Sequence, residues 1–296
     1  MSVVNYPELL QVDHRAPWLV RYMIWLFSWL SPPLARRLIA LLLIIPRRYP
    51  RPQREAERLE SAERHKIHFE GKEVAVWRWR PSVSTQTLST APQLLLVHGW
   101  EGRGSQLAAV VPAMLARGWQ VLAVDAPGHG ESAGRSLSAP EYAAVLLQVE
   151  RSFGSFSGII AHSFGSIATT LALRQGLRCE RLAFIGAGIW VDETLDRLGL
   201  IIGCSTKLVR EALQLRARNE GINWRVLFAD ELYQEQSTPL LVIHDRGDRE
   251  IPFSLVSRLQ AAWPTSELKA TEGLGHRRIL RAPEVTSALE TWFCRE

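Results

Sequence analysis

The stretch "SGIIAHSFGSIATTLAL", residues 157–173, joins two kinds of secondary structure at one serine. Its first part is a short apolar run typical of a buried strand, and its second part resumes with apolar residues at helical spacing. Ser163 therefore occupies a tight turn, with the small residues Ala161 and Gly165 two positions away on either side. In a strand–turn–helix of this kind the serine Oγ projects over the carboxyl ends of neighbouring parallel strands. The stretch predicts a parallel sheet with a reactive side chain at its edge.

The rest of the chain repeats this alternation from residue 67 onward. Strand-like runs occupy residues 72–80, 93–99, 119–130, 181–188, 239–245 and 266–273, and helix-like runs lie between them. Such a pattern is typical of a mostly parallel sheet flanked by helices, which is an α/β fold. We expect this domain to span residues 61–296. Between about residues 187 and 238 the strand pattern lapses, and two helical runs predict an inserted helical lid.

The first sixty residues have a different character. Two apolar helical segments, residues 18–30 and 34–45, flank Ser31-Pro32-Pro33, which predicts a helical hairpin followed by a polar linker up to residue 60 that ends in a short helix. Each segment is shorter than a bilayer span and contains arginine. One interpretation is a hairpin packed on the main domain or at a dimer contact. The other is a membrane-surface anchor, because Trp18, Trp25 and Trp29 suit an interface.

Composition restricts the function classes. Lysine and arginine outnumber aspartate and glutamate 35 to 30, and eight arginines without an acid lie between His14 and Arg54. This local charge favours a surface contact and argues against nucleic-acid binding. The three scattered cysteines fit neither a disulfide framework nor a metal site, and residues 1–15 lack the features of a signal peptide. We therefore expect a cytoplasmic protein, or one peripheral to the inner face of the membrane, without metal or cofactor.

A serine is a good nucleophile only when a base takes its proton and a third group orients that base. For a serine at a strand-to-helix turn, the acid and then the histidine should follow in the chain. Asp248 lies just beyond the strand run at 239–245, and His276 lies in a glycine loop before the last helix. The predicted catalytic set is Ser163, Asp248 and His276, with Asp245 and Asp192 as alternative acids.

These stretches resemble the α/β-hydrolase family over roughly residues 67–296. The matching motifs are "LLLVHGWEG", "DAPGHGES", "IIAHSFGS", "IHDRGDREIP" and "GLGHRRIL". Two positions depart from the family pattern, since Ala161 replaces the first glycine of the serine motif and Asp245 stands where the acid loop usually has glycine. The resemblance implies an oxyanion hole formed by the backbone N–H groups of Trp100 and Phe164.

The predicted activity is hydrolysis of a small-molecule carboxylic ester through an acyl-enzyme. A thioesterase, a small peptidase or amidase, a membrane-associated lipid hydrolase and a non-catalytic binding protein are the alternatives. Trp190, together with Trp100, is expected to border the substrate pocket. Four arginines near the acid and the histidine are interpreted as loop-fixing charges, with recognition of an anionic substrate group as the alternative: Arg246, Arg249, Arg277 and Arg278.

Overall fold

The computed structural model describes residue 8, residues 15–82 and residues 90–295. Residues 1–15 carry the expectation that a signal peptide is absent. They lie outside the described residues except for positions 8 and 15. None of the helices in the described ranges has both the length and the apolar character that crossing a membrane requires.

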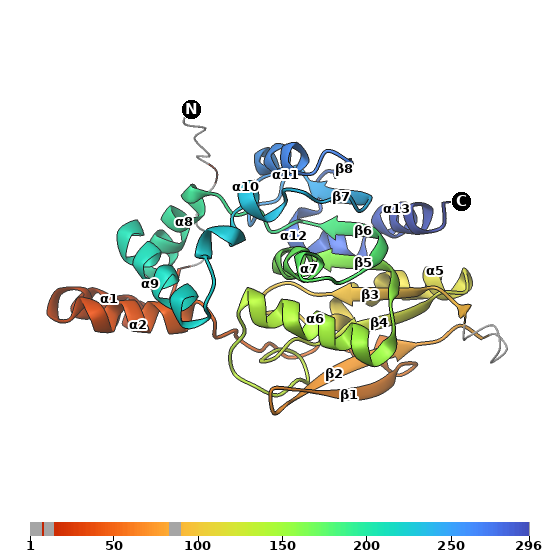
Figure 1. Ribbon diagram of the computed structural model, residues 1–296, viewed down its shortest axis with the longest axis horizontal. Coiled ribbons are helices and arrows are strands. Elements are labelled where there is room, and N and C mark those ends of the chain that lie inside the picture. Colours follow the sequence, from red (N-terminus) through yellow and green to blue (C-terminus); the bar gives the residue numbers. More distant parts are fainter. Residues whose placement is uncertain (1–7, 9–14, 83–89, 296) are drawn as a thin grey trace.

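An eight-stranded sheet forms the centre of the molecule (Figure 1). Its strands run in the order β1-β2-β4-β3-β5-β6-β7-β8, and the six from β4 to β8 in this order are parallel, whereas β1 and β2 pair antiparallel. The strands are β1 (Glu63–Phe69), β2 (Lys72–Trp79), β3 (Gln93–Val97), β4 (Gln120–Val124), β5 (Phe156–His162), β6 (Cys179–Ile185), β7 (Leu240–Asp245) and β8 (Ser266–Thr271). The predicted α/β fold with a mostly parallel sheet is confirmed.

The structure differs from the sequence expectation at β1. The first strand was expected at residues 72–80, with the alternation beginning at residue 67, yet residues 63–66 already belong to a strand that pairs with β2. In the sequence ERHKIHF, Glu63, Arg64 and Lys66 are charged, and Ile67 is the one buried residue of this edge strand. Charged residues on edge strands also discourage pairing with other chains.

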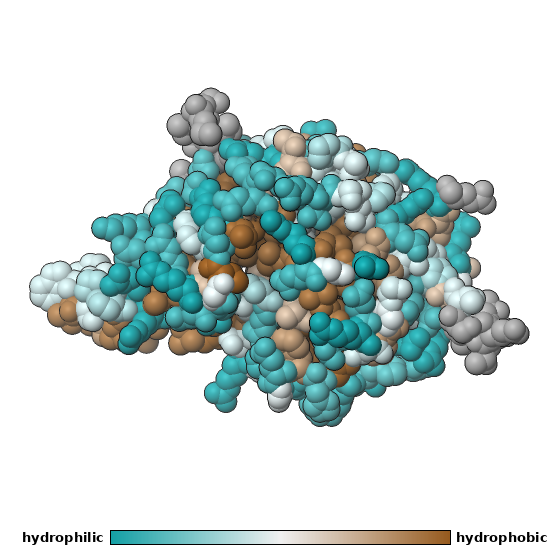
Figure 2. Space-filling view, viewed as in Figure 1, coloured by the Kyte–Doolittle hydropathy of each residue, from teal (hydrophilic) through white to brown (hydrophobic). Residues whose placement is uncertain are grey.

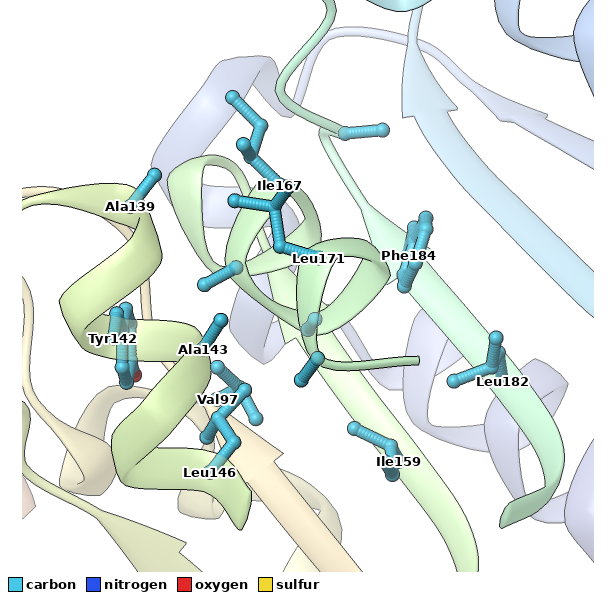
Figure 3. Packing of buried hydrophobic residues seen from close by; sticks show 14 of the residues in the cluster. Val97, Ala139, Tyr142, Ala143, Leu146, Ile159, Ile167, Leu171, Leu182 and Phe184 are labelled. Carbon is cyan, nitrogen blue, oxygen red and sulfur yellow. The ribbon is translucent and has the colours of Figure 1, made fainter. Parts of the chain in front are cut away.

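Helices cover both faces of the sheet. One face is packed by α6 (Ala139–Phe153), α7 (Phe164–Arg174), α10 (Ala229–Leu232) and α11 (Val256–Ala262). The other is packed by α3 (Gln53–Leu59), η2 (Gly104–Val110), α5 (Val111–Ala116) and α13 (Pro283–Phe293), and the short α12 (Gly275–Arg278) and η5 (Ile279–Arg281) precede α13. Figure 3 shows Ala143 and Leu146 of α6 next to Val97 of β3, in the cluster that also contains Leu171 of α7 and Ile159 of β5. Burial of this apolar surface is the main source of stability for such a layered fold.

A separate group of helices stands at one end of the molecule (Figure 1). The segment between β6 and β7 forms α8 (Asp192–Ile202), α9 (Thr206–Asn219) and η3 (Trp224–Leu227) before α10. The N-terminal helices α1 (Trp18–Leu30) and α2 (Pro32–Leu42) form a hairpin, which shares a buried cluster with α8 and α9 that includes Ile24, Ile39 and Leu208. The hairpin therefore packs on the segment predicted to be a lid. A short helix, η4 (Phe253–Leu255), precedes α11.

Candidate active site

Ser163 lies at the corner between β5 and α7 in a strained conformation. Its φ of 50° and ψ of −123° are unusual for a residue with a side chain. Glycines make the close approach possible, because a Cβ at Gly165 would lie 2.6 Å from the His98 carbonyl oxygen and one at Gly99 would lie 2.9 Å from the Ser163 Cβ. The backbone is fixed as well: the Ser163 carbonyl accepts hydrogen bonds from the N–H groups of Ser166 and Gly188 at 2.9 and 3.1 Å.

His276 and Asp248 form a buried pair. The His276 Nδ1–H donates to Asp248 Oδ2 at 2.7 Å, and the two side chains are 6% and 1% exposed. Asp248 Oδ1 in turn accepts the backbone N–H groups of Glu250 and Ile251 at 2.8 and 2.9 Å. Burial alone would raise the pKa of Asp248, but the hydrogen bond from His276 and its charge hold that pKa below the usual value. With Nδ1 occupied, Nε2 is the nitrogen that can act as a base.

The two alternative acids have other partners. Asp245 Oδ2 accepts the Thr271 hydroxyl at 2.8 Å and the Leu274 N–H at 3.0 Å, so it connects the end of β7 to the loop that carries His276. Asp192 begins α8, is half exposed and pairs with Arg225 at 3.1 Å. Of the three candidate acids, the structure brings Asp248 to the histidine.

The loop after β3 presents the predicted oxyanion-hole residue Trp100. The next residue, Glu101, has φ of 56°, and its N–H donates to His129 Nε2 at 3.1 Å. His98 supports the same loop, because its Nδ1–H donates to the Gly99 carbonyl at 2.7 Å and its Nε2 accepts the Ala126 N–H at 3.0 Å. Burial lowers the pKa of His129 to about 4 and that of His98 well below its usual value, so both rings are neutral supports of the loop.

Phe164, the second predicted oxyanion-hole residue, opens α7. Backbone N–H groups in the first turn of a helix have no acceptor within the helix, and they carry the positive end of its dipole. The rings of Phe164 and Trp100 meet edge to face with centroids 5.5 Å apart. The two residues thus lie side by side, and Phe164 directly follows Ser163 in the chain. Their assignment to this role stays a prediction.

The segment between the hairpin and the sheet also reaches this loop. Arg47 Nε pairs with Glu101 Oε1 at 2.9 Å, and Arg48 donates to four backbone carbonyls of residues 128–134 at 2.7–3.2 Å. Glu55 forms an ion pair with Arg103 at 2.7 Å, in which each side chain is 7% exposed. Part of the region predicted as a linker is therefore packed against the loop that follows β3.

A cavity of about 1300 Å³ is lined by residues of the serine turn, the loop after β3 and the loop that carries His276. Ser163, His276, Trp100 and Trp190 all line it, and its apolar wall continues onto the hairpin and the segment from α8 to η3. The apolar lining residues from those two regions are Val20, Leu42, Leu43, Ile44, Ile45, Leu198, Ile201, Ile202, Leu213, Ile222, Trp224 and Leu227. A cavity of this size and lining suits an apolar group of a small-molecule ligand. Among the described residues there is no group of three or more His, Cys, Asp or Glu side chains that could hold a metal ion.

The arginines near the site mostly have partners within the protein. Arg277 Nε pairs with Glu250 at 3.0 Å, and Arg278 donates to the carbonyls of Gly273 and Leu274 at 2.7 and 3.0 Å. The guanidinium of Arg246 lies 4.8 Å from the centre of the Phe253 ring. These contacts favour the interpretation that the arginines fix loops.

Sequence reasoning missed several residues that support the site. Glu250 Oε2 lies 3.9 Å from His276 Nε2, and the carboxylate of buried Asp125 accepts the N–H groups of Gly104 and Glu131 at 2.7 and 3.0 Å. The Tyr233 hydroxyl donates to the Gly188 carbonyl at 2.7 Å. Asp125 could have been noticed in "DAPGHGES", since an acid directly after a buried strand needs a partner.

Comparison with known proteins agrees with the fold. The model of the alpha/beta hydrolase family matches residues 94–231. The chain is 26% identical over 246 residues, covering 69% of it and 95% of the relative, to the pimeloyl-[acyl-carrier protein] methyl ester esterase of Aeromonas hydrophila subsp. hydrophila. The enzyme of the same name from Nitrosomonas europaea is 24% identical over 245 residues, which is 69% of this chain and 96% of that one.

Solved structures show the same architecture. A bacterial membrane phospholipase A superposes with a TM-score of 0.60 at 16% identity, over 93% of this chain and 95% of that one. Sheet order and the serine corner agree with the family match, and the chain has the α/β-hydrolase fold.

Proposed function

We propose that this protein hydrolyses carboxylic esters through an acyl-enzyme formed on Ser163. The observation that carries the proposal is that the strained Ser163 and His276, whose Nδ1–H donates to the buried Asp248, line the same cavity. Strain at a non-glycine residue persists only where the surrounding structure enforces it, and it is concentrated at functional sites.

The proposed reaction gives each of these groups one role. His276 Nε2 takes the proton of the Ser163 hydroxyl while Oγ bonds to the ester carbonyl carbon, and the carbonyl oxygen becomes an oxyanion held by the N–H groups of Trp100 and Phe164. The intermediate collapses, the C–O bond to the alcohol breaks, and the imidazolium gives its proton to the leaving oxygen. Water then attacks the acyl-enzyme with His276 again as base, which releases the acid and restores the serine.

Asp248 makes this cycle possible in two ways. By accepting the Nδ1–H at 2.7 Å it keeps the tautomer in which Nε2 is free, and its negative charge stabilises the imidazolium that forms. Its second oxygen accepts two backbone N–H groups, so the carboxylate is held in place.

The lining of the cavity supports an ester with an apolar acyl or alcohol group. Most side chains that line it from the hairpin and from α8 are aliphatic, and Trp190 is also part of the lining. The curated relatives are named for a methyl ester on a carrier-bound acyl chain, which is in keeping with an extended apolar acyl group. Thioesters share the same acyl chemistry and are the nearest alternative substrates.

A fluorophosphonate probe tests the mechanism. We expect wild type to be labelled and to hydrolyse p-nitrophenyl esters, with Ser163→Ala and His276→Ala both unlabelled. Ser152→Ala, at an exposed serine of α6, is the matched control and should retain full labelling. Failure of the folded wild type to be labelled or to cleave any ester of the panel would refute the hydrolase proposal and favour a binding protein on the same fold.

A further inference from the structure

The outward face of the N-terminal hairpin carries a row of aromatic side chains that the fold leaves uncovered. Trp18, Tyr22, Trp25 and Trp29 are spaced i, i+4, i+7 and i+11, so they lie along one side of α1. The three tryptophans are 77%, 61% and 79% exposed. The exposed apolar residues beside this row are Leu19, Met23, Leu30, Leu34, Leu41 and Ile45. Figure 2 shows hydrophobic surface along the lower edge of the protrusion where Figure 1 places α1 and α2.

The hairpin does not need this face for its own folding. Its other side supplies Ile24, Ala35 and Ile39 to the cluster that it shares with α8 and α9. The Ala16 N–H donates to the Ile201 carbonyl at 2.9 Å, and Arg36 pairs with Glu211 at 3.5 Å, so both helices are anchored to that segment. An apolar patch that the fold leaves exposed in this way marks a surface that binds a membrane or another molecule.

The charge around the patch indicates which one. Residues 15–54 contain no acidic residue. Of the eight arginines in this stretch, Arg36, Arg47 and Arg51 pair with acidic side chains elsewhere in the protein, whereas Arg37 is exposed on α2 among the apolar side chains. Arginines beside a patch of tryptophan and leucine are the composition of helices that lie in the headgroup region of anionic membranes. Charge of a single sign does not favour contact between two copies of this face, because the like charges would repel each other.

The size of the helices agrees with a surface position. With 13 and 11 residues and a rise of about 1.5 Å per residue, α1 and α2 are about 20 and 17 Å long, less than the hydrocarbon core of about 30 Å. Tryptophan prefers the membrane–water boundary, where its ring is in contact with acyl chains and its N–H with water.

We propose that the exposed face of α1 and α2 is a membrane-binding surface that lies in the headgroup region of an anionic bilayer. This position would also bring lipid close to the cavity, because Val20, Leu43 and Ile45 of the hairpin region line the cavity that contains Ser163. The binding itself does not depend on catalysis, so it is tested apart from the proposed function.

The test is flotation of the full chain, carrying Ser163→Ala to prevent hydrolysis, with vesicles of phosphatidylcholine alone or with phosphatidylglycerol. We expect binding to the anionic vesicles, weaker binding at high salt and to neutral vesicles, and a partition coefficient reduced about a hundredfold by Trp25→Ser/Trp29→Ser, which is about tenfold for each tryptophan. Arg37→Glu should reduce it about fivefold. Leu268→Ser, at an exposed apolar residue of β8, is the control and should bind as before.

Three results would overturn the proposal. The first is absence of binding to anionic vesicles, and the second is equal binding by the double tryptophan variant. The third is a stable dimer in sedimentation analysis that the same two substitutions dissociate, because the face would then be a contact between copies of this chain. Since all the replaced side chains are exposed, thermal melting of each variant should match that of the parent.

Discussion

The buried ion pair between Glu55 and Arg103 yields a quantitative prediction about the loop beside the active site. Glu55 Oε2 accepts Arg103 Nε at 2.7 Å and the Ser105 hydroxyl at 2.8 Å, and Oε1 accepts Arg103 Nη2 at 3.3 Å. In Glu55→Leu the guanidinium would keep its hydrogen bond to the Tyr49 carbonyl, 3.2 Å from Nη1, and its charge would be buried without the Glu55 carboxylate. Breaking one side of a buried pair costs about 3–5 kcal/mol.

For a domain of this size we expect a decrease in melting temperature of about 10 °C, from a shift of roughly 2–4 °C per kcal/mol. Arg103→Met should destabilise to a similar extent, because it leaves a buried carboxylate. The double variant Glu55→Leu/Arg103→Met should recover most of the loss, since apolar residues of similar volume replace a buried pair at little net cost.

Urea unfolding of wild type, both single variants and the double variant measures this as a thermodynamic cycle, in which we expect a coupling of at least about 2 kcal/mol. The control is the exposed pair Arg295–Glu267, where Glu267→Gln should change stability by less than about 1 kcal/mol. Additive effects of the two single substitutions, or single effects below about 1 kcal/mol, would refute the reasoning.

Three further predictions concern the site itself. Asp248→Asn should retain the fold but lower kcat by about 10³–10⁴-fold in ester assays, because an amide favours the tautomer of His276 with its proton on Nε2; a loss below tenfold would contradict the assigned role. Ser163→Gly should be inactive yet melt higher than Ser163→Ala, by the equivalent of about 1 kcal/mol, because glycine accepts φ of 50° without strain; equal melting temperatures would show that the corner is relaxed. Burial lowers the pKa of His129 to about 4 and that of His162 to about 3. Both residues bind protons in the unfolded state below pH 6.5 and not in the folded state. Stability should therefore fall from pH 7 to pH 5, by about 2 kcal/mol for each ring, and His129→Gln should flatten the unfolding free energy measured across that range; an unchanged slope would argue against a neutral His129.

The central part of the fold could be predicted because its sequence signals are local. The strands β3 to β7 are buried on both faces, so each appears as a continuous apolar run that ends in a turn. The serine turn could be predicted from a local pattern as well, since a strand, a small-residue turn and a helix follow one another within 17 residues. The order of Asp248 and His276 in the chain then identified the two side chains that the structure brings to 2.7 Å.

The remainder depends on contacts between residues far apart in the chain, for which the sequence carries no local signal. Glu55 and Arg103 are separated by 48 positions, and each alone has the pattern of a surface charge. The edge strand β1 was not predicted for a related reason. With one buried residue it has little apolar periodicity, and its conformation depends on pairing with β2.

The segment between the hairpin and the sheet makes these distant parts of the molecule depend on one another. Just after α2, Ile44 lines the cavity and its carbonyl accepts the Leu137 N–H at 2.8 Å, and three positions later Arg47 pairs with Glu101 in the loop with positive φ. A displacement of the hairpin would therefore also move the turn that presents Trp100. The buried Glu55 at the far end pins the segment to the sheet domain, which limits how far such a displacement can move the turn.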